Sequence, residues 1–154
     1  MKRIWIFVAI VVTLIIFVPI VTVHGGNQKP IEIIDAQTLD PNGNPKTVFS
    51  RGETVVVSVT IKYTATYYYY ASLSYLLIVE DFAPDLTIPG LGFVMDNIDP
   101  GEQKTVGYGF ILPYDTPTGI HKIWVYVWNG WPSVMGAQWD EYAEPVCLEI
   151  TVTG

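Results

Sequence analysis

The most regular stretch of the sequence alternates apolar and polar residues. Between positions 53 and 63 every second residue is apolar, namely Val55, Val57, Val59, Ile61 and Tyr63. The residues between them include Thr54, Ser58, Thr60 and Lys62. An extended chain sends alternate side chains to opposite faces, so this two-residue period predicts a β-strand with one buried face.

Similar runs lie between turn-forming residues along the rest of the chain. They cover residues 30–36, 73–79, 105–112, 121–128 and 146–152. The separating segments are rich in Pro, Gly, Asp and Asn, which favour turns. No convincing helix follows residue 26. About seven short strands with this spacing are typical of an all-β fold, and we expect an antiparallel β-sandwich of the immunoglobulin-like type.

Residues 4–23 differ from the rest because they contain no charge. A helix of that length spans about 30 Å at ~1.5 Å per residue, which matches the hydrocarbon core of a bilayer. Lys2 and Arg3 precede it, and basic residues prefer the cytoplasmic side of a membrane. The sequence therefore predicts an N-terminal transmembrane or signal helix, with the remainder outside the cell membrane. Its apolar side chains include Ile4, Trp5, Phe7, Leu14 and Phe17.

Two interpretations of this segment remain open. A cleaved signal peptide has a basic start, an apolar core and small residues before the cut. Pro19 would break the helix, and Val23 and Gly25 occupy the two cut-site positions. The apolar run exceeds the usual ~7–15 residues of a signal core, which favours a retained anchor. Residues 1–26 are thus predicted as anchor or signal peptide, and residues 27–154 as the ectodomain, either held at the cell membrane or secreted.

Composition narrows the classes of partner. Of the 8 basic residues, Lys2 and Arg3 belong to the N-terminal segment, so the ectodomain carries 6 basic and 15 acidic residues, a net charge of −9. Nucleic-acid binding needs a clustered basic surface, so no nucleic-acid partner is expected. A single cysteine excludes both an intramolecular disulfide and a multi-cysteine zinc site.

A search for catalytic groups finds little. The two histidines are His24, at the possible cleavage site, and His121, in a predicted strand. A Cys–His pair between His121 and Cys147 is conceivable on neighbouring strands, but a structural cysteine is the better interpretation. No G-x-S-x-G motif is present, and nothing in the spacing of the carboxylates selects a catalytic pair. We therefore expect a protein that is not an enzyme and needs no cofactor.

A calcium site is weakly suggested. Asp40, Asn42 and Asn44 resemble the start of a calcium loop, but Pro45 and Arg51 stand where the EF-hand needs Gly and Glu. A turn is the better interpretation of this segment. Loop carboxylates could still bind calcium jointly, although a solvated acidic rim is the simpler expectation. They are Asp81, Asp85, Asp96 and Asp99.

Aromatic residues form the most informative pattern. Residues 67–70 are four tyrosines in a row. Alternation on the strand at 121–128 separates an aliphatic face from an aromatic one. The aliphatic set is Ile123, Val125 and Val127, and the aromatic set is Trp124, Tyr126 and Trp128. Trp131 and Trp139 follow in the next loop.

If the aliphatic set faces the core, three large aromatic side chains point outward. Such patches seldom stay bare, and Trp and Tyr dominate interfaces, so these five aromatic residues are our candidate partner-binding site. Two alternatives stand beside it. The loop could fold back and bury its own tryptophans against the sheet, or the rings could stack on sugars. The two faces could also be inverted, since Trp also fills sandwich cores.

Turn motifs add a resemblance to a known family. Residues 49–53 (FSRGE) precede the valine-rich strand, residues 99–102 (DPGE) precede Thr105 and Val106, and Thr118-Gly119 precedes the aromatic strand. These motifs resemble the CARDB-like extracellular adhesion domains, in which such turns open strands B, E and F. The resemblance covers about residues 30–153 and departs from the family in the aromatic segment at 129–144. It implies a non-catalytic domain of a prokaryotic, notably archaeal, cell-surface protein.

The leading hypothesis is a non-enzymatic exported protein with a structural or adhesive role. Its expected partners are the membrane, through residues 4–23, and a second copy or a cell-envelope protein. A subunit of an extracellular filament, of the pilus- or archaellum-associated kind, is the first alternative, since such proteins join an apolar helix to a β-sandwich head. A carbohydrate-binding accessory module, with a glycan as ligand, is the second.

Overall fold

The computed structural model describes residues 29–64 and 71–154. The predicted N-terminal membrane segment, His24 and the four tyrosines at 67–70 lie outside the described residues. Among those described, no helix is long and apolar enough to cross a bilayer.

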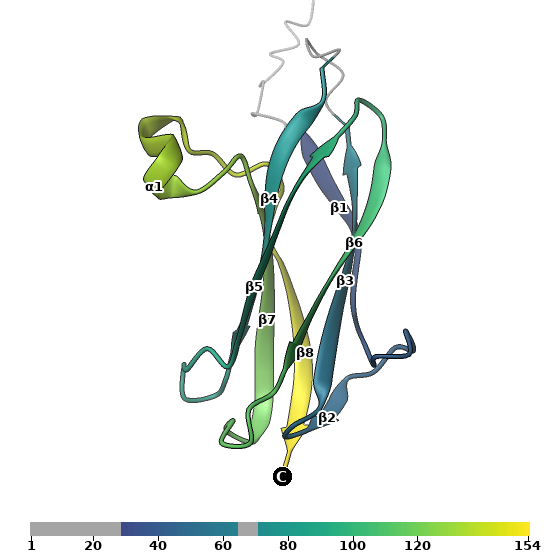
Figure 1. Cartoon of the computed structure of the whole chain (residues 1–154), viewed down its shortest axis with the longest axis vertical. Coiled ribbons are helices and arrows are strands. Elements are labelled where there is room, and N and C mark those ends of the chain that lie inside the picture. Colours follow the sequence, from purple (N-terminus) through teal and green to yellow (C-terminus); the bar gives the residue numbers. More distant parts are fainter. Residues whose placement is uncertain (1–28, 65–70) are drawn as a thin grey trace, which may run out of the picture.

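Within these residues, eight strands form two packed sheets (Figure 1). The three-stranded sheet has the order β1-β3-β6, and the five-stranded sheet has the order β2-β8-β7-β4-β5. The bounds are β1 (Ile31–Leu39), β2 (Val48–Ser50), β3 (Thr54–Tyr63), β4 (Leu73–Phe82), β5 (Gly90–Ile98), β6 (Gln103–Ile111), β7 (Gly119–Trp128) and β8 (Val146–Thr153). The prediction of an all-β sandwich is confirmed.

The strand pairing departs from the prediction at one place. All pairs are antiparallel except β2 with β8, which run parallel. After β1 the chain crosses from one sheet to the other. Lys46 holds this crossing, because its N–H donates to the Thr38 carbonyl at 3.0 Å and its own carbonyl accepts from Thr38 Oγ1 at 2.6 Å. The crossing places β2 beside the C-terminal strand with the same direction.

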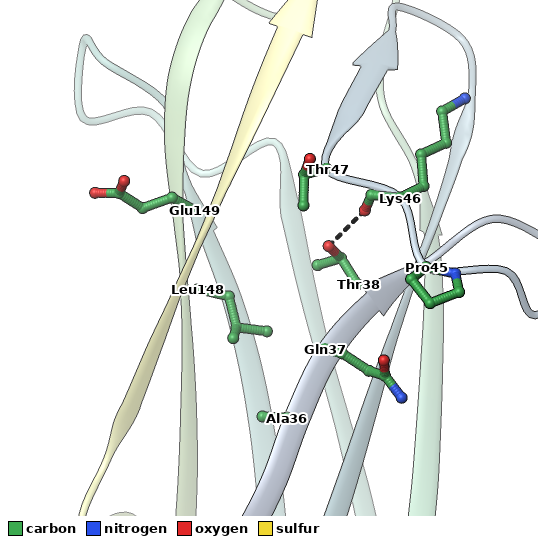
Figure 2. Close-up of a pocket in the computed structure, with 8 residues that line it drawn as sticks. All are labelled: Ala36, Gln37, Thr38, Pro45, Lys46, Thr47, Leu148 and Glu149. Atoms are coloured by element: carbon green, nitrogen blue, oxygen red, sulfur yellow. Dashed lines mark hydrogen bonds between the residues drawn. The ribbon is translucent and has the colours of Figure 1, made fainter.

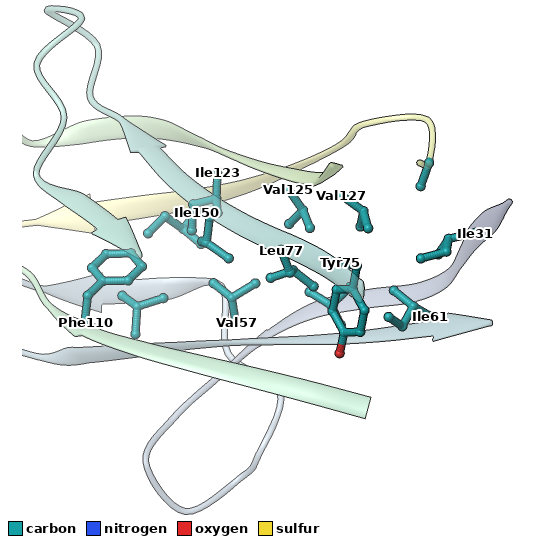
Figure 3. Close-up of a cluster of buried hydrophobic side chains, with 14 of the residues drawn as sticks. Ile31, Val57, Ile61, Tyr75, Leu77, Phe110, Ile123, Val125, Val127 and Ile150 are labelled. Atoms are coloured by element: carbon teal, nitrogen blue, oxygen red, sulfur yellow. The ribbon is translucent and has the colours of Figure 1, made fainter. Parts of the chain in front are cut away.

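The core lies between the sheets and follows the predicted alternation. Val55, Val57, Val59 and Ile61 on β3 are fully buried, and Tyr63 nearly so. On the facing sheet, the alternate residues of β7 fill the core, as Figure 3 shows for Ile123, Val125 and Val127. Burying one such aliphatic side chain contributes roughly 1.5–3 kcal/mol, so the alternation itself selects which face of each strand turns inward.

The sequence pattern missed two strands, β2 and β5. β2 has three residues, too few to show a period. β5 has no apolar residues at its buried positions near its start, because these are Gly90 and Gly92. A search for alternating apolar side chains therefore finds nothing there, although the backbone pairs with β4 along its whole length.

These two glycines let β6 approach β5 across the gap between the sheets. A Cβ at position 92 would overlap the ring of Tyr108, and a Cβ at position 90 would overlap the ring of Phe110. Tyr108 also donates a hydrogen bond from its hydroxyl to the Leu91 carbonyl at 3.2 Å. The aromatic rings of β6 thus take the place of side chains on β5.

We expect Gly92→Ala to lower the free energy of unfolding by about 1–3 kcal/mol, because the Tyr108 ring must leave its position. Denaturant unfolding of the full-length protein measures this. Gly107→Ala is the matched control: the nearest heavy atom to its Cβ lies at 3.9 Å, so we expect a change within about 0.5 kcal/mol. Equal losses in the two variants would contradict the role given to Tyr108.

The segment between β7 and β8 contains a short helical element that the sequence reading did not predict. It consists of α1 (Pro132–Met135) and the single 3₁₀ turn at Gly136–Gln138. Pro132 stands at the first helical turn, a position that its fixed φ angle favours. Four residues are too few for a helical period to appear in the sequence.

Candidate functional site

The outward side of the five-stranded sheet carries the predicted aromatic residues. Ile123, Val125 and Val127 face the core with no exposed area, so Trp124, Tyr126 and Trp128 point outward on β7. The ring centroids of Trp124 and Tyr126 are 6.3 Å apart, and those of Tyr126 and Trp128 are 5.6 Å apart. All three rings are half-buried, so they form a continuous but partly covered ladder.

The loop that follows β7 folds back over one end of this ladder. The Trp139 ring packs edge-on against Trp128 with centroids 5.3 Å apart, and Trp131 packs edge-on against Phe93 of β5 at 5.1 Å. Asn129 closes the loop, donating from Nδ2 to the Gln138 carbonyl at 2.6 Å and accepting from the Asp140 N–H at 3.1 Å. The structure therefore follows the alternative in which the loop buries its own tryptophans.

This cover creates a second apolar cluster outside the main core. Leu76 and Ile78 of β4 point to the outward side, yet they are 0% and 2% exposed. Register places Leu76 between Trp128 and Met95, and Ile78 between Tyr126 and Phe93. Trp128, Trp131 and Trp139 are consequently structural at least in part, whereas Trp124 lies beyond the loop.

The rest of the same face is open and apolar. Leu91, Phe93 and Met95 on β5 are 55%, 54% and 63% exposed, and they follow one another on the outward side of the sheet edge. We call Leu91, Phe93, Met95, Glu80, Lys122, Trp124 and Tyr126 the aromatic face. Sequence reasoning missed its β5 part together with the strand itself.

The opposite side of the sandwich has a different character. The outward residues of β3 include Ser58, Thr60 and Lys62, and Thr60 shares a hydrogen bond with Thr105 of β6 at 2.9 Å between hydroxyl oxygens. The outer face of the three-stranded sheet is thus largely polar. The two outer faces of the sandwich therefore differ in chemistry.

Two charged groups on the aromatic face have no counterpart. Among residues 29–64 and 71–154, the ion pairs are formed by Lys29, Lys46, Lys104 and His121. Neither Glu80 nor Lys122 takes part in an ion pair or a hydrogen bond within that set. Glu80 is half-buried between its cross-strand neighbours Leu91 and Trp124. Burial is the main cause that raises the pKa of Tyr126, and the negative charge of Glu80 raises it further.

His121 and Asp81 form a buried pair on the inner side of the same sheet. Both side chains are 0% exposed, and His121 Nδ1 lies 3.0 Å and 3.1 Å from the two Asp81 carboxylate oxygens. The second nitrogen, Nε2, lies 2.8 Å from the Pro117 carbonyl. Burial raises the pKa of the Asp81 carboxyl, and the hydrogen bond to His121 opposes this. With both nitrogens engaged and no exposure, His121 cannot act on a substrate at the surface.

The conceivable Cys–His pair does not form. His121 and Cys147 lie on neighbouring strands, as the sequence suggested, but β7 turns His121 inward while β8 turns Cys147 outward. Opposite faces of one sheet prevent the thiol and the imidazole from meeting. Although Cys147 points outward, partial burial raises the pKa of its thiol, and this disfavours the reactive thiolate.

The four carboxylates considered for calcium are separated by the fold. Asp81 is the buried partner of His121, and Asp85 lies in the turn before β5, where it accepts hydrogen bonds from Thr87. Asp96 and Asp99 lie at the other end of β5, and Asp96 pairs with Lys104 at 2.7 Å. In the described part of the chain, no three His, Cys, Asp or Glu side chains are grouped to hold a metal ion.

The Asp40 segment is a hydrogen-bonded turn. The Asp40 carboxylate accepts from the N–H groups of Asn42 at 2.8 Å and Asn44 at 2.9 Å. These bonds lower the pKa of Asp40, with those from Asn44 contributing most. Its oxygens are occupied by the turn itself.

A shallow groove of about 300 Å³ opens on one side of the sandwich, between β1 and β8 (Figure 2). Ala36 and Leu148 form its floor, and the Thr38 to Lys46 hydrogen bond closes one end. The charged ends of Lys46 and Glu149 point away from each other in Figure 2, and Lys46 pairs with Glu53 at 2.8 Å. The groove offers no set of convergent polar groups that could perform chemistry.

Comparison with protein-family models and with curated protein sequences gives no match. Solved structures of similar fold exist. The C-terminal domain of wzt has a TM-score of 0.60 at 11% identity, covering 82% of this chain and 75% of that one. A Pseudomonas fluorescens alkylpurine DNA glycosylase, AlkC, has a TM-score of 0.55 at 14% identity over 81% of this chain. A β-glucuronidase of glycoside hydrolase family 2 has a TM-score of 0.54 at 10% identity, also over 81%.

The chain corresponds to only part of the two enzymes. It spans 31% of the glycosylase chain and 13% of the glucuronidase chain. At these identities the likeness shows the fold alone, because one fold hosts many unrelated functions.

Proposed function

We propose that this protein is a non-enzymatic cell-surface protein that binds a partner through its aromatic face. The β-sandwich lies outside the membrane, joined to it by residues 1–26 or released from it. The observation that carries the proposal is the contrast between the two outer faces. Leu91, Phe93 and Met95 are exposed beside half-buried Trp124 and Tyr126, while the opposite sheet presents mainly hydroxyl and charged groups.

Physical reasoning connects this contrast to binding. Soluble domains seldom leave contiguous apolar patches in water, and large ones mark interaction sites. The rings of Trp124 and Tyr126 bury much area at a small entropic cost, which suits them to interfaces. A structural or adhesive role needs only such a surface, and it makes no use of the buried His121.

The finer fold type is part of the proposal. Two features support an immunoglobulin-like sandwich. The first strand is divided between the sheets, because β1 lies in one sheet while β2 pairs in parallel with β8 in the other. The second feature is the strand order β8-β7-β4-β5. In that correspondence β5 occupies the place of strand C′, at the edge of the sheet. The CARDB-like resemblance of the turn motifs stays a prediction.

A test uses the full-length protein on intact cells and a membrane-impermeant cross-linker. Leu91→Ser, Phe93→Ser and Met95→Ser are combined in one variant. Because these side chains are more than half exposed, the fold is expected to persist, and cross-linked species should decrease at least about tenfold as the apolar contact is lost. The readout is the yield of cross-linked protein on a gel, normalised to total protein.

A matched control comes from the other sheet. Ile34 and Ile111 are also exposed apolar residues, 45% and 64% respectively, on β1 and β6. Ile34→Ser and Ile111→Ser should leave the cross-linked yield unchanged. If the β5 variant cross-links as well as the wild type, or if no part of the protein is reached from outside the cell, the proposed function is wrong.

A further inference from the structure

The aromatic face carries its own complementary charges, and from this we infer that its partner is a second copy of the same chain. This inference rests on the proposed function, because it names the occupant of the same surface. Glu80 and Lys122 point outward on adjacent strands, and among the described residues neither has an ion-pair partner. Glu149 of β8, directly opposite Lys122, is a further outward carboxylate that forms no ion pair among the described residues. A surface that carries unpaired charges of both signs beside apolar side chains can complement itself.

Glu80 is the informative member of this pair. It is half-buried with Leu91 on one side and Trp124 on the other, so its carboxylate loses part of its hydration without gaining a partner. A charge in that position is costly unless it is paired. A cation brought by a partner would lie beside the carboxylate and over the neighbouring indole ring, where both interactions are favourable.

Lys122 supplies such a cation. It is exposed, two residues before Trp124 on β7, and stands opposite Phe82 and Glu149 in the strand register. Two-fold symmetry makes every contact reciprocal. An axis that places Lys122 of one copy over Glu80 of the other therefore also places Glu80 over Lys122.

The other basic groups in the described part of the chain are less suited. Lys29, Lys46 and Lys104 are held in ion pairs within the chain, and Arg51 donates from Nε to the Thr116 carbonyl at 2.6 Å. Lys62 is free, but it lies on the polar outer face of the other sheet. Among residues 29–64 and 71–154, Lys122 is thus the free cation that shares a face with the Glu80 carboxylate.

The net charge of the ectodomain opposes self-association and must be weighed against this contact. The charge of −9 repels a second copy at long range. At physiological ionic strength the Debye length is about 8 Å, so charges far from the contact are largely screened, whereas a buried Lys–Glu contact is screened less. We therefore expect association to be weaker at low salt than at physiological salt.

Charge reversal tests the inference. Two full-length copies with different affinity tags are co-expressed, solubilised in a mild detergent and co-purified. Glu80→Lys alone should weaken co-purification at least about tenfold, since it brings like charges together in the contact, and Lys122→Glu alone should do the same. When one copy carries Glu80→Lys and the other Lys122→Glu, opposite charges meet again, and recovery should return to near the wild-type level.

Controls apply the same charge changes to the other sheet. Glu32→Lys and Lys62→Glu reverse exposed charges on the outer face of β1 and β3, and neither should alter co-purification. These variants separate a local contact from the effect of net charge. Association through residues 1–26 would be insensitive to all of these substitutions.

The outcomes distinguish this inference from the proposed function. If Glu80→Lys leaves co-purification unchanged, or if the mixed pair fails to recover it, the second copy is not the occupant. If the triple serine variant of β5 nevertheless loses its cross-links on cells, the aromatic face binds another partner, such as a glycan-linked envelope component, and the proposed function stands. If the serine variant also behaves as wild type, both are wrong.

Discussion

Replacing Asp81 with alanine should lower the free energy of unfolding by about 3–5 kcal/mol, because it leaves His121 buried without its partner. Both side chains have no exposed area, and they join β4 to β7 in the middle of the five-stranded sheet. Removing one member of a buried pair leaves the other desolvated and uncompensated, which is more costly than a lost contact between apolar groups.

The hydrogen-bond geometry explains why both partners are required. The Pro117 carbonyl can only accept, so His121 Nε2 donates to it across 2.8 Å. The proton on Nε2 of His121 is thus assigned from its hydrogen-bond partner. Nδ1 faces both oxygens of Asp81, so this carboxyl group is the hydrogen-bond partner of the second ring nitrogen. Without Asp81, the Nδ1 atom would face an apolar core with no partner.

Denaturant unfolding of the full-length protein, followed by circular dichroism, measures the loss. Asp115→Ala is the control, because Asp115 is an exposed carboxylate in the loop next to Pro117, and its removal should cost less than about 0.5 kcal/mol. His121→Ala should cost a similar amount to Asp81→Ala, and the double variant much less than the sum. Additive losses would show that the two groups do not act as a pair.

Leu76→Ala should lower the free energy of unfolding by about 2–5 kcal/mol, as expected for a side chain in a core. This is unusual for a residue on the outward side of a sheet. Leu76 is fully buried because Trp128 flanks it and the loop carrying Trp131 and Trp139 packs against this end of the sheet. The result would establish that the loop encloses a second apolar cluster.

Leu77→Ala and Leu91→Ala are the two reference variants for Leu76→Ala, one in the main core and one at the exposed surface. Leu77 faces the main core and should show a loss of the same size as Leu76, whereas Leu91 is more than half exposed and should change stability by less than about 0.5 kcal/mol. Unfolding by denaturant compares the three variants. If Leu76→Ala behaves like Leu91→Ala, the loop does not cover the sheet in solution.

The alternation of side chains allowed much of the sandwich to be predicted. Val55 to Tyr63 on β3, and Ile123 to Val127 on β7, show a period that only a half-buried strand satisfies, and their burial follows it residue by residue. Burial alternates in the same way on β8, where Leu148 and Ile150 are more buried than Cys147 and Glu149. Local patterns of this kind are readable because burial acts on each side chain separately.

Features that depend on distant partners were not readable in this way. β5 was missed because the side chains that fill its inner face belong to Tyr108 and Phe110 of another strand. The burial of Trp128 and Trp139 depends on where the loop after β7 folds. The pairing of His121 with Asp81 depends on the register of β4 against β7. The amino-acid order thus determines which face of each strand is apolar, since that needs only alternation and hydration. Only the tertiary structure decides which of those faces is covered and which segment covers it. The reason is that the covering contacts form between segments that are distant in the sequence, so neither segment alone contains their energy.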